Sequence, residues 1–147
     1  MLRIMTIDDY DEVYALWKSI KRFAMRRVDD SREGVARFLA RNPETSVVCE
    51  MDGRLVGSIL CGHDGRRGYL YHVCVAEDCR RRGLGKAMVE FCLAALEKEG
   101  ITKASLIAFT HNYAGNAFWE RLRWARRGDL HFYEYALNEG NVVDINE

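Results

Sequence analysis

A short stretch with the sequence RRRGLGK, at residues 80–86, places basic side chains around two glycines, just before a strongly periodic apolar segment. A helix that begins here leaves its first backbone N–H groups without intrahelical partners, and the helix dipole is positive at that end. Gly83 and Gly85 lack a Cβ, so an anion can approach these N–H groups closely. The charge-assisted donors around them would be Arg80, Arg81, Arg82 and Lys86. The stretch therefore predicts a site for a pyrophosphate.

This pattern differs from two better-known phosphate-binding loops. A P-loop requires G-x-x-x-x-G-K-[ST], but Arg80 stands at the first glycine and Ala87 follows Lys86. A dinucleotide fingerprint requires a third glycine, where this chain has Met88. The alternative is that the glycines only begin a helix whose arginines are solvated. The apolar strand before the stretch and the long helix after it favour the anion site.

The elements that must position this loop indicate a mixed α+β fold. Apolar runs predict strands at 2–5, 46–50, 54–62, 69–75, 102–109 and 132–137. Helices are expected to begin at Thr6 or Asp8, at Ser31, near Gly83 and near Tyr113. Asp52-Gly53 predicts a hairpin, so an antiparallel meander should carry a strand–helix–strand unit near its centre. We expect one domain over residues 1–147, with a frayed polar tail at 138–147.

Composition narrows the classes of function. The chain has 22 Lys and Arg against 22 Asp and Glu, so we expect no nucleic-acid partner. Five cysteines lack the spacing of a disulfide scaffold or a zinc site, which favours reduced thiols, no metal and a cytoplasmic protein. The N-terminus has no apolar leader and no run is long enough to cross a bilayer, so no membrane partner is expected.

The segment VCVAEDCRRRGLGKAMVEFCLAAL resembles motif A of the GNAT superfamily of acetyl-CoA-dependent N-acetyltransferases. In that motif a strand ending in valine precedes [QR]-x-x-G-x-[GA] and a helix, and Arg80, Gly83 and Gly85 occupy the motif positions. The resemblance extends from SVVCEMDGRLVGSIL to HNYAGNAFWERLRW. It implies a mainly antiparallel central sheet flanked by helices, splayed at the strand before the phosphate-binding helix, and acetyl-CoA as cosubstrate.

The resemblance also implies how the cosubstrate is held. Pantetheine would lie in the opening of the sheet against the strand backbone, and the thioester carbonyl would point at an N–H of that strand, which stabilises an oxyanion. The loop after the strand would hold the pyrophosphate, and an asparagine at the start of the next helix would contact the cofactor arm. The cofactor-binding residues implied in this way are Val73, Cys74, Val75, Arg80, Arg81, Arg82, Gly83, Leu84, Gly85, Lys86, Asn112 and Trp119.

Two positions depart from the family pattern N-x-x-A-x-x-F-Y. Gly115 stands at the alanine, and Trp119 stands at the tyrosine that protonates the leaving thiolate, although an indole cannot act as an acid. Trp119 either forms a wall of the acetyl pocket or belongs to the core. Ile107 stands where ribosomal-protein acetylases of the superfamily carry a glutamate base. A CoA thiol leaves readily, whereas an amine with a pKa of about 10 must lose its proton, so the base matters more.

The candidates for acid or base are His72 and Tyr71 on the splayed strand, His111 before the next helix, and Tyr113 or Tyr133 as substitute acids. Each has a structural alternative: His72 as a bonded strand histidine, His111 as a turn or cap residue, and the tyrosines as packing. The acidic residues Asp29, Asp30 and Glu33 either attract a cationic acceptor or begin a solvated helix.

Three functions remain open from the sequence. The preferred one is transfer of acetyl from acetyl-CoA to a primary amine of a small molecule or peptide, by direct attack in a ternary complex. The second is a catalytically impaired acyl-CoA-binding or sensing module, motivated by the absent tyrosine and glutamate. The third is a nucleic-acid binder using KRFAMRR and RRRGLGK, which the zero net charge disfavours. A homodimer is common among proteins with this resemblance.

Overall fold

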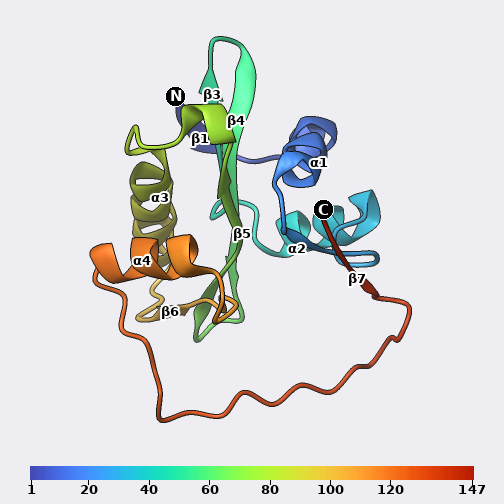
Figure 1. Cartoon of the computed structure of the whole chain (residues 1–147), viewed down its shortest axis with the longest axis vertical. Coiled ribbons are helices and arrows are strands. Elements are labelled where there is room, and N and C mark those ends of the chain that lie inside the picture. Colours follow the sequence, from blue (N-terminus) through green and yellow to red (C-terminus); the bar gives the residue numbers. More distant parts are fainter.

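The computed structural model describes all residues, 1–147, and confirms the α+β class with a mainly antiparallel sheet flanked by helices. Helices α3 and α4 lie on one face of the central sheet, and α1 and α2 lie on the other (Figure 1). The helices are α1 (Tyr10–Ser19), α2 (Arg32–Arg41), α3 (Leu84–Lys98) and α4 (Tyr113–Arg121), with short 3-10 turns η1 (Ile7–Asp9) and η2 (Glu77–Cys79). None of them is both long and apolar enough to cross a membrane.

The central sheet has five strands in the order β1-β3-β4-β5-β6. Its strands are β1 (Leu2–Ile4), β3 (Val47–Met51), β4 (Arg54–His63), β5 (Gly68–Val75) and β6 (Ala104–Ser105). The first four pair antiparallel, and α3 connects β5 to the parallel strand β6. The hairpin predicted at Asp52-Gly53 joins β3 to β4, and both turn residues have positive φ, at 51° and 75°.

Two hydrophobic clusters hold the helices to the sheet. On the α1 and α2 side, Trp17 and Val13 are fully buried, and the Trp17 Nε1–H donates to Ser58 Oγ of β4 at 3.2 Å. On the opposite side, Met88 and Val89 of α3 pack on β3 and β4. The apolar stripe of α3, read from its sequence, is therefore the face that seats this helix on the sheet.

The sheet opens along β5, as the sequence led us to expect. A bulge lies at His72, whose φ is +52°, because Ser58 pairs with Cys74 while Leu60 pairs with Tyr71. Strand β6 pairs with β5 only at residues 68 and 69, so the two strands separate beyond that point. The main chain of β5 after the bulge therefore borders an opening in the sheet.

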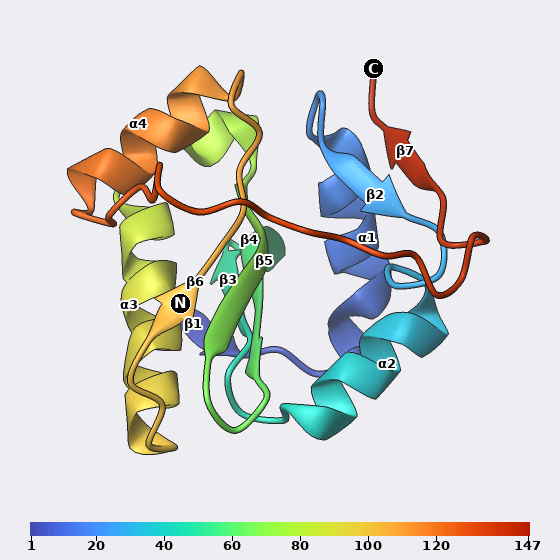
Figure 2. The ribbon, with the colours of Figure 1, turned by 90° about the horizontal axis from the view of Figure 1, so that it is seen from below.

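The C-terminal segment differs from the sequence prediction. Residues 132–137 join no strand, and of the expected strand 102–109 only Ala104–Ser105 enters the sheet. Residues 138–147 do not end as a free tail, because β7 (Val143–Ile145) pairs antiparallel with β2 (Ala24–Arg26). The chain after α4 must cross from one side of the molecule to the other to reach β2, which holds residues 132–137 away from the sheet (Figure 2).

Candidate active site

The loop before α3 presents an uninterrupted row of backbone donors. The N–H groups of residues 81–86 donate to no acceptor in the protein, and the first helical bond runs from the Ala87 N–H to the Gly83 carbonyl at 3.1 Å. Arg81 and Gly83 both have left-handed backbone, with φ of 64° and 78°. Left-handed residues within such a turn make neighbouring N–H groups converge, which forms a concave anion site. Positive φ is uncommon for a residue that carries a Cβ.

The basic side chains of the loop are placed differently from one another. The Arg80 Nε–H donates to the Val75 carbonyl at 3.1 Å, so Arg80 ties the loop to the end of β5. Lys86 lies 3.9 Å from Glu90 in an exposed pair, a weak interaction. Arg81 and Arg82 are exposed and form no ion pair, so their guanidinium groups are available to an anion. These charges surround the row of free N–H groups.

The two glycines of the loop have different roles. A Cβ on Gly83 would meet nothing within 4 Å, so its side faces open space and its positive φ is what requires glycine. A Cβ on Gly85 would lie 3.2 Å from two ring atoms of Phe118. Gly85 therefore allows α4 to pack closely on the start of α3, a role that the sequence did not reveal.

Strand β5 faces the opening in the sheet mainly with backbone N–H groups. The Ala76 N–H donates to the Val56 carbonyl of β4 at 2.7 Å. Because N–H groups alternate along a strand, those of Val73 and Val75 face the other edge, where β6 has separated. The Cys74 side chain is buried in the α1 cluster, and burial raises the pKa of its thiol to about 11. Cys74 is therefore a neutral core thiol.

The His72 side chain packs on the α1 and α2 side of β5, against two aromatic rings and one carboxylate. Its Nε2 is 2.8 Å from Asp30 Oδ1, and both side chains are mostly buried, with 17% and 6% of their surface exposed. The imidazole sits between Trp17 and Phe23, each at a ring-centroid distance of 4.8 Å. Asp30 is thus not part of a solvated helix start.

At the start of α4, Asn112 acts as a helix cap. Its Oδ1 accepts from the Gly115 N–H at 3.0 Å, and a Cβ on Gly115 would lie 2.4 Å from Asn112 Nδ2. A side chain at position 115 would therefore displace the Asn112 amide from this capping position. Trp119 packs edge-on against Phe118, at 4.9 Å between ring centroids, and against Trp124, at 5.0 Å. Both neighbours belong to the periphery of the α3 cluster.

The remaining acid and base candidates are not gathered with His72. His111 stacks on Phe109 at 5.2 Å in the exposed turn before α4. Tyr113 and Tyr133 are 80% and 87% exposed, and neither side chain makes a hydrogen bond. Because α4 and its preceding turn lie across the sheet from α1, His111 and Tyr113 are on the opposite side of the sheet from His72 (Figure 1). Tyr133 belongs to the segment after α4 that crosses between the two sides (Figure 2).

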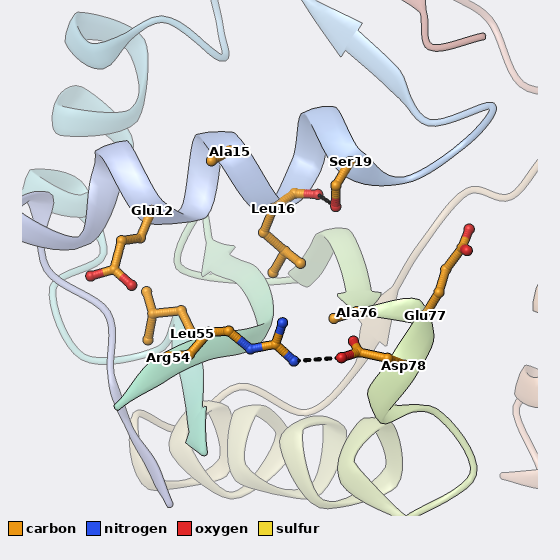
Figure 3. A pocket seen from close by; sticks show the side chains of 9 residues that line it. All are labelled: Glu12, Ala15, Leu16, Ser19, Arg54, Leu55, Ala76, Glu77 and Asp78. Atoms are coloured by element: carbon orange, nitrogen blue, oxygen red, sulfur yellow. Dashed lines mark hydrogen bonds and ion pairs between the residues drawn. The ribbon is translucent and has the colours of Figure 1, made fainter. Parts of the chain in front are cut away.

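A hollow of about 540 Å³ lies apart from these groups, between α1 and the segment that follows β5 (Figure 3). Its lining residues are Glu12, Ala15, Leu16, Ser19, Arg54, Leu55, Ala76, Glu77 and Asp78. Arg54 and Asp78 pair at 2.8 Å at its edge. Since it contains neither His72 nor the free N–H groups, we do not assign the acyl-transfer site to it. No motif in the sequence indicated this hollow.

A turn with free N–H groups, set between an open strand and a long helix, is what the resemblance to acetyl-CoA-dependent acetyltransferases implied, and comparison with known proteins supports that family. The sequence model of the acetyltransferase (GNAT) family matches residues 10–124. An acetyltransferase of Sodalis glossinidius is 32% identical over 123 residues, covering 84% of this chain and 85% of its own. One from Pectobacterium atrosepticum is 31% identical over 123 residues, covering 84% and 86%. The chain belongs to the GNAT family and is an acetyltransferase.

Solved structures show the same fold at low sequence identity. The PaiA N-acetyltransferase of Thermoplasma acidophilum, in complex with coenzyme A, has a TM-score of 0.71 at 15% identity and covers 83% of this chain and 87% of its own. AAC(6')-Iy, in complex with a bisubstrate analogue, has a TM-score of 0.72 at 15% identity, with coverage of 92% and 97%. The relatives carry the name acetyltransferase, and no comparison favours the impaired CoA-binding module.

Proposed function

We propose that this protein transfers the acetyl group of acetyl-CoA to a primary amine of a small molecule or peptide, by direct attack in a ternary complex. The observation that carries the proposal is the row of unpaired N–H groups at residues 81–86, beside a strand whose outer edge is open. A diphosphate has enough oxygens to accept from several of these donors at once.

The arrangement supports a path for the acetyl donor. With the diphosphate on the loop, the pantetheine arm would run along β5, where the N–H groups of Val73 and Val75 face the opening. Bonded to the same edge, the thioester carbonyl would reach the bulge at His72. The acceptor amine would approach from the α1 and α2 side, toward which the His72 side chain points. We assign Asn112 and Trp119 no chemical step and treat them as groups that shape the site. The Asn112 side chain caps α4, and Trp119 packs in an aromatic cluster.

The compartment that we propose is the cytoplasm. All five cysteines are buried free thiols, a state that a reducing compartment maintains.

The proposal is tested by acetyl-CoA binding and by turnover. Acetyl-CoA should raise the melting temperature of the wild type, and a panel of amines, polyamines, aminoglycosides and peptides should identify acceptors through release of free CoA thiol. Reversing charge with Arg81→Glu and Lys86→Glu together should weaken acetyl-CoA binding about a hundredfold, since two charge-assisted contacts are lost.

The matched control is Arg66→Glu with Arg67→Glu, an equal change of charge in the exposed turn before β5. It should leave acetyl-CoA affinity within about a factor of three. Equal weakening by both double variants would show that the loop has no special part in binding, and lack of acetyl-CoA binding by the wild type would contradict the proposal itself.

A further inference from the structure

We propose that Asp30 and His72 form the proton-accepting pair of this enzyme: His72 takes the proton of the acceptor amine on Nδ1, and Asp30 is a positioning residue that holds the ring through Nε2. The inference rests on the proposed function and specifies how the same site activates its amine. The two residues are 42 positions apart in the sequence and meet only in the fold.

Both oxygens of the Asp30 carboxylate form hydrogen bonds. Its Oδ1 lies 2.8 Å from His72 Nε2, and its Oδ2 accepts from the Arg26 N–H at 2.7 Å. The Tyr10 hydroxyl donates to the Asp30 main-chain carbonyl at 2.6 Å. These hydrogen bonds hold the Asp30 side chain in one conformation, and Asp30 in turn orients the His72 imidazole.

This geometry sets the tautomer of His72. An ionised carboxylate only accepts, so the hydrogen of a neutral imidazole must be on Nε2, and Nδ1 carries the lone pair. His72 Nδ1 makes no hydrogen bond within the protein. Every fully buried side-chain nitrogen and oxygen in the protein does have a hydrogen-bond partner, so Nδ1 is not one of the fully buried atoms. Nδ1 therefore reaches solvent, and it is the ring atom that an incoming molecule can contact.

The location of His72 fits the reaction. Its positive φ places it at the bulge where β5 begins to part from β6, and its side chain lies on the face opposite α3. The packing of Trp17 and Phe23 on the ring prevents it from rotating away. A nucleophile entering from the α1 side would meet Nδ1 at the point where the proposed thioester path ends.

The proton and electron balance of the step is complete with the two substrates. An alkylammonium acceptor gives one proton to His72 Nδ1 and becomes a free amine. The amine lone pair forms the C–N bond, and the electron pair of the breaking C–S bond leaves on sulfur as the CoA thiolate. The second proton of the new N-acetyl nitrogen passes to the thiolate or to solvent, and His72 returns its proton to solvent.

The pair is tested first by the tautomer of His72, because this measurement needs no substrate. Nitrogen-15 NMR of the wild type should show the hydrogen of neutral His72 on Nε2. In Asp30→Asn, the amide oxygen can still accept from the Arg26 N–H while the Asn Nδ2 donates to His72 Nε2. The hydrogen should then move to Nδ1 and block the proton-accepting atom. A wild type with its hydrogen on Nδ1 would overturn the inference.

The kinetic test uses two probes of nearly equal shape, n-butylamine and O-propylhydroxylamine. The first is mostly protonated near neutral pH, with a pKa of about 10 for such amines, whereas the oxygen next to nitrogen keeps the second unprotonated. Asp30→Asn and His72→Gln should each lower kcat/KM for n-butylamine about a hundredfold. The same variants should lower it for O-propylhydroxylamine by less than about threefold, because that probe needs no base.

The control variant is Asp9→Asn, which removes another buried carboxylate, in this case one paired with Arg3; Asp9 and Asp30 are 8% and 5% exposed. Asp9→Asn should lose stability but keep the pH profile of kcat/KM for n-butylamine, whereas Asp30→Asn should lose the limb that belongs to His72. Among the titratable groups near this pair, Tyr10 bonds the main chain of Asp30, and Tyr71 precedes His72 along β5. The charges of Arg26 and Asp29 act on the Tyr71 hydroxyl. Only Asp30 bonds the ring.

The outcomes separate the two proposals. Equal losses for both probes, or an unchanged pH profile in Asp30→Asn, would overturn the pair while acetyl-CoA binding and thiol release still support the enzyme. Failure of the wild type to bind acetyl-CoA would contradict the proposed function, and the His72 tautomer would still be measured.

Discussion

The C-terminal segment is expected to stabilise the domain through one side chain, Asn146. Its Nδ2 donates to the carbonyls of Trp17 and Ile20, at 2.8 and 2.9 Å, where α1 ends. Carbonyls at a helix C-terminus lack intrahelical donors, so the Asn146 amide acts as an external cap. Asn146→Ala removes both bonds without changing the backbone.

The size of the stability loss depends on which hydrogen-bond donors the two carbonyls retain in Asn146→Ala. The Trp17 carbonyl also accepts from the Ile20 N–H at 3.2 Å, and the Ile20 carbonyl accepts from the Phe23 N–H at 3.4 Å. Because neither carbonyl is left without a donor, the loss is that of two net hydrogen bonds, about 1–2 kcal/mol in the free energy of unfolding. In urea this lowers the midpoint by roughly 0.5–1 M for a domain of this size.

The measurement is urea unfolding followed by tryptophan fluorescence, with Asn138→Ala as the matched control. The Asn138 side chain bonds only the nearby Gly140 N–H, at 2.8 Å, so its removal should change stability by less than about 0.5 kcal/mol. An Asn146→Ala variant as stable as Asn138→Ala would show that the Asn146 side chain does not stabilise the end of α1.

Three further predictions concern ionisation and packing. Arg3 holds the pKa of Asp9 below its usual range, so the ion pair should stabilise the fold fully above about pH 4 and lose this effect as the pH falls through the folded-state pKa. We expect Asp9→Asn to be less stable than the wild type by about 2 kcal/mol at neutral pH. Denaturation measured over a series of acidic pH values should show this difference shrinking. A thiol reagent at about pH 8 should label no cysteine of the native protein before unfolding, because all are buried and the pKa of Cys74 is about 11; rapid native labelling would contradict this burial. Trp119→Tyr should keep acetyl-CoA affinity within about a factor of three in calorimetry, because the indole packs against Trp124, and a large loss would place Trp119 against the cofactor.

The parts of the fold that depend on local sequence were predictable. The Ser31 hydroxyl caps α2 by accepting from the Gly34 N–H at 3.1 Å, as its type and position indicated. Asp52-Gly53 forms the expected hairpin, and the apolar period of α3 gives the buried face of that helix. These signals lie within a few residues of the structure that they determine.

The parts that depend on distant segments were not predictable. Strand β7 is short, lies in a polar tail and pairs with β2 more than a hundred residues earlier, so no local pattern marks it. The same holds within the site: His72 was a candidate from its strand, but its partner Asp30 and its aromatic neighbours come from other elements. For Gly85, the sequence suggested space for an anion, while the fold places Phe118 beside it.

A crystal structure of the protein with coenzyme A tests the central claim most directly. We predict that the diphosphate oxygens accept from the N–H groups of residues 81–86 and that pantetheine follows β5 to the bulge at His72. A diphosphate bound elsewhere, for example in the hollow between α1 and Asp78, would contradict the account.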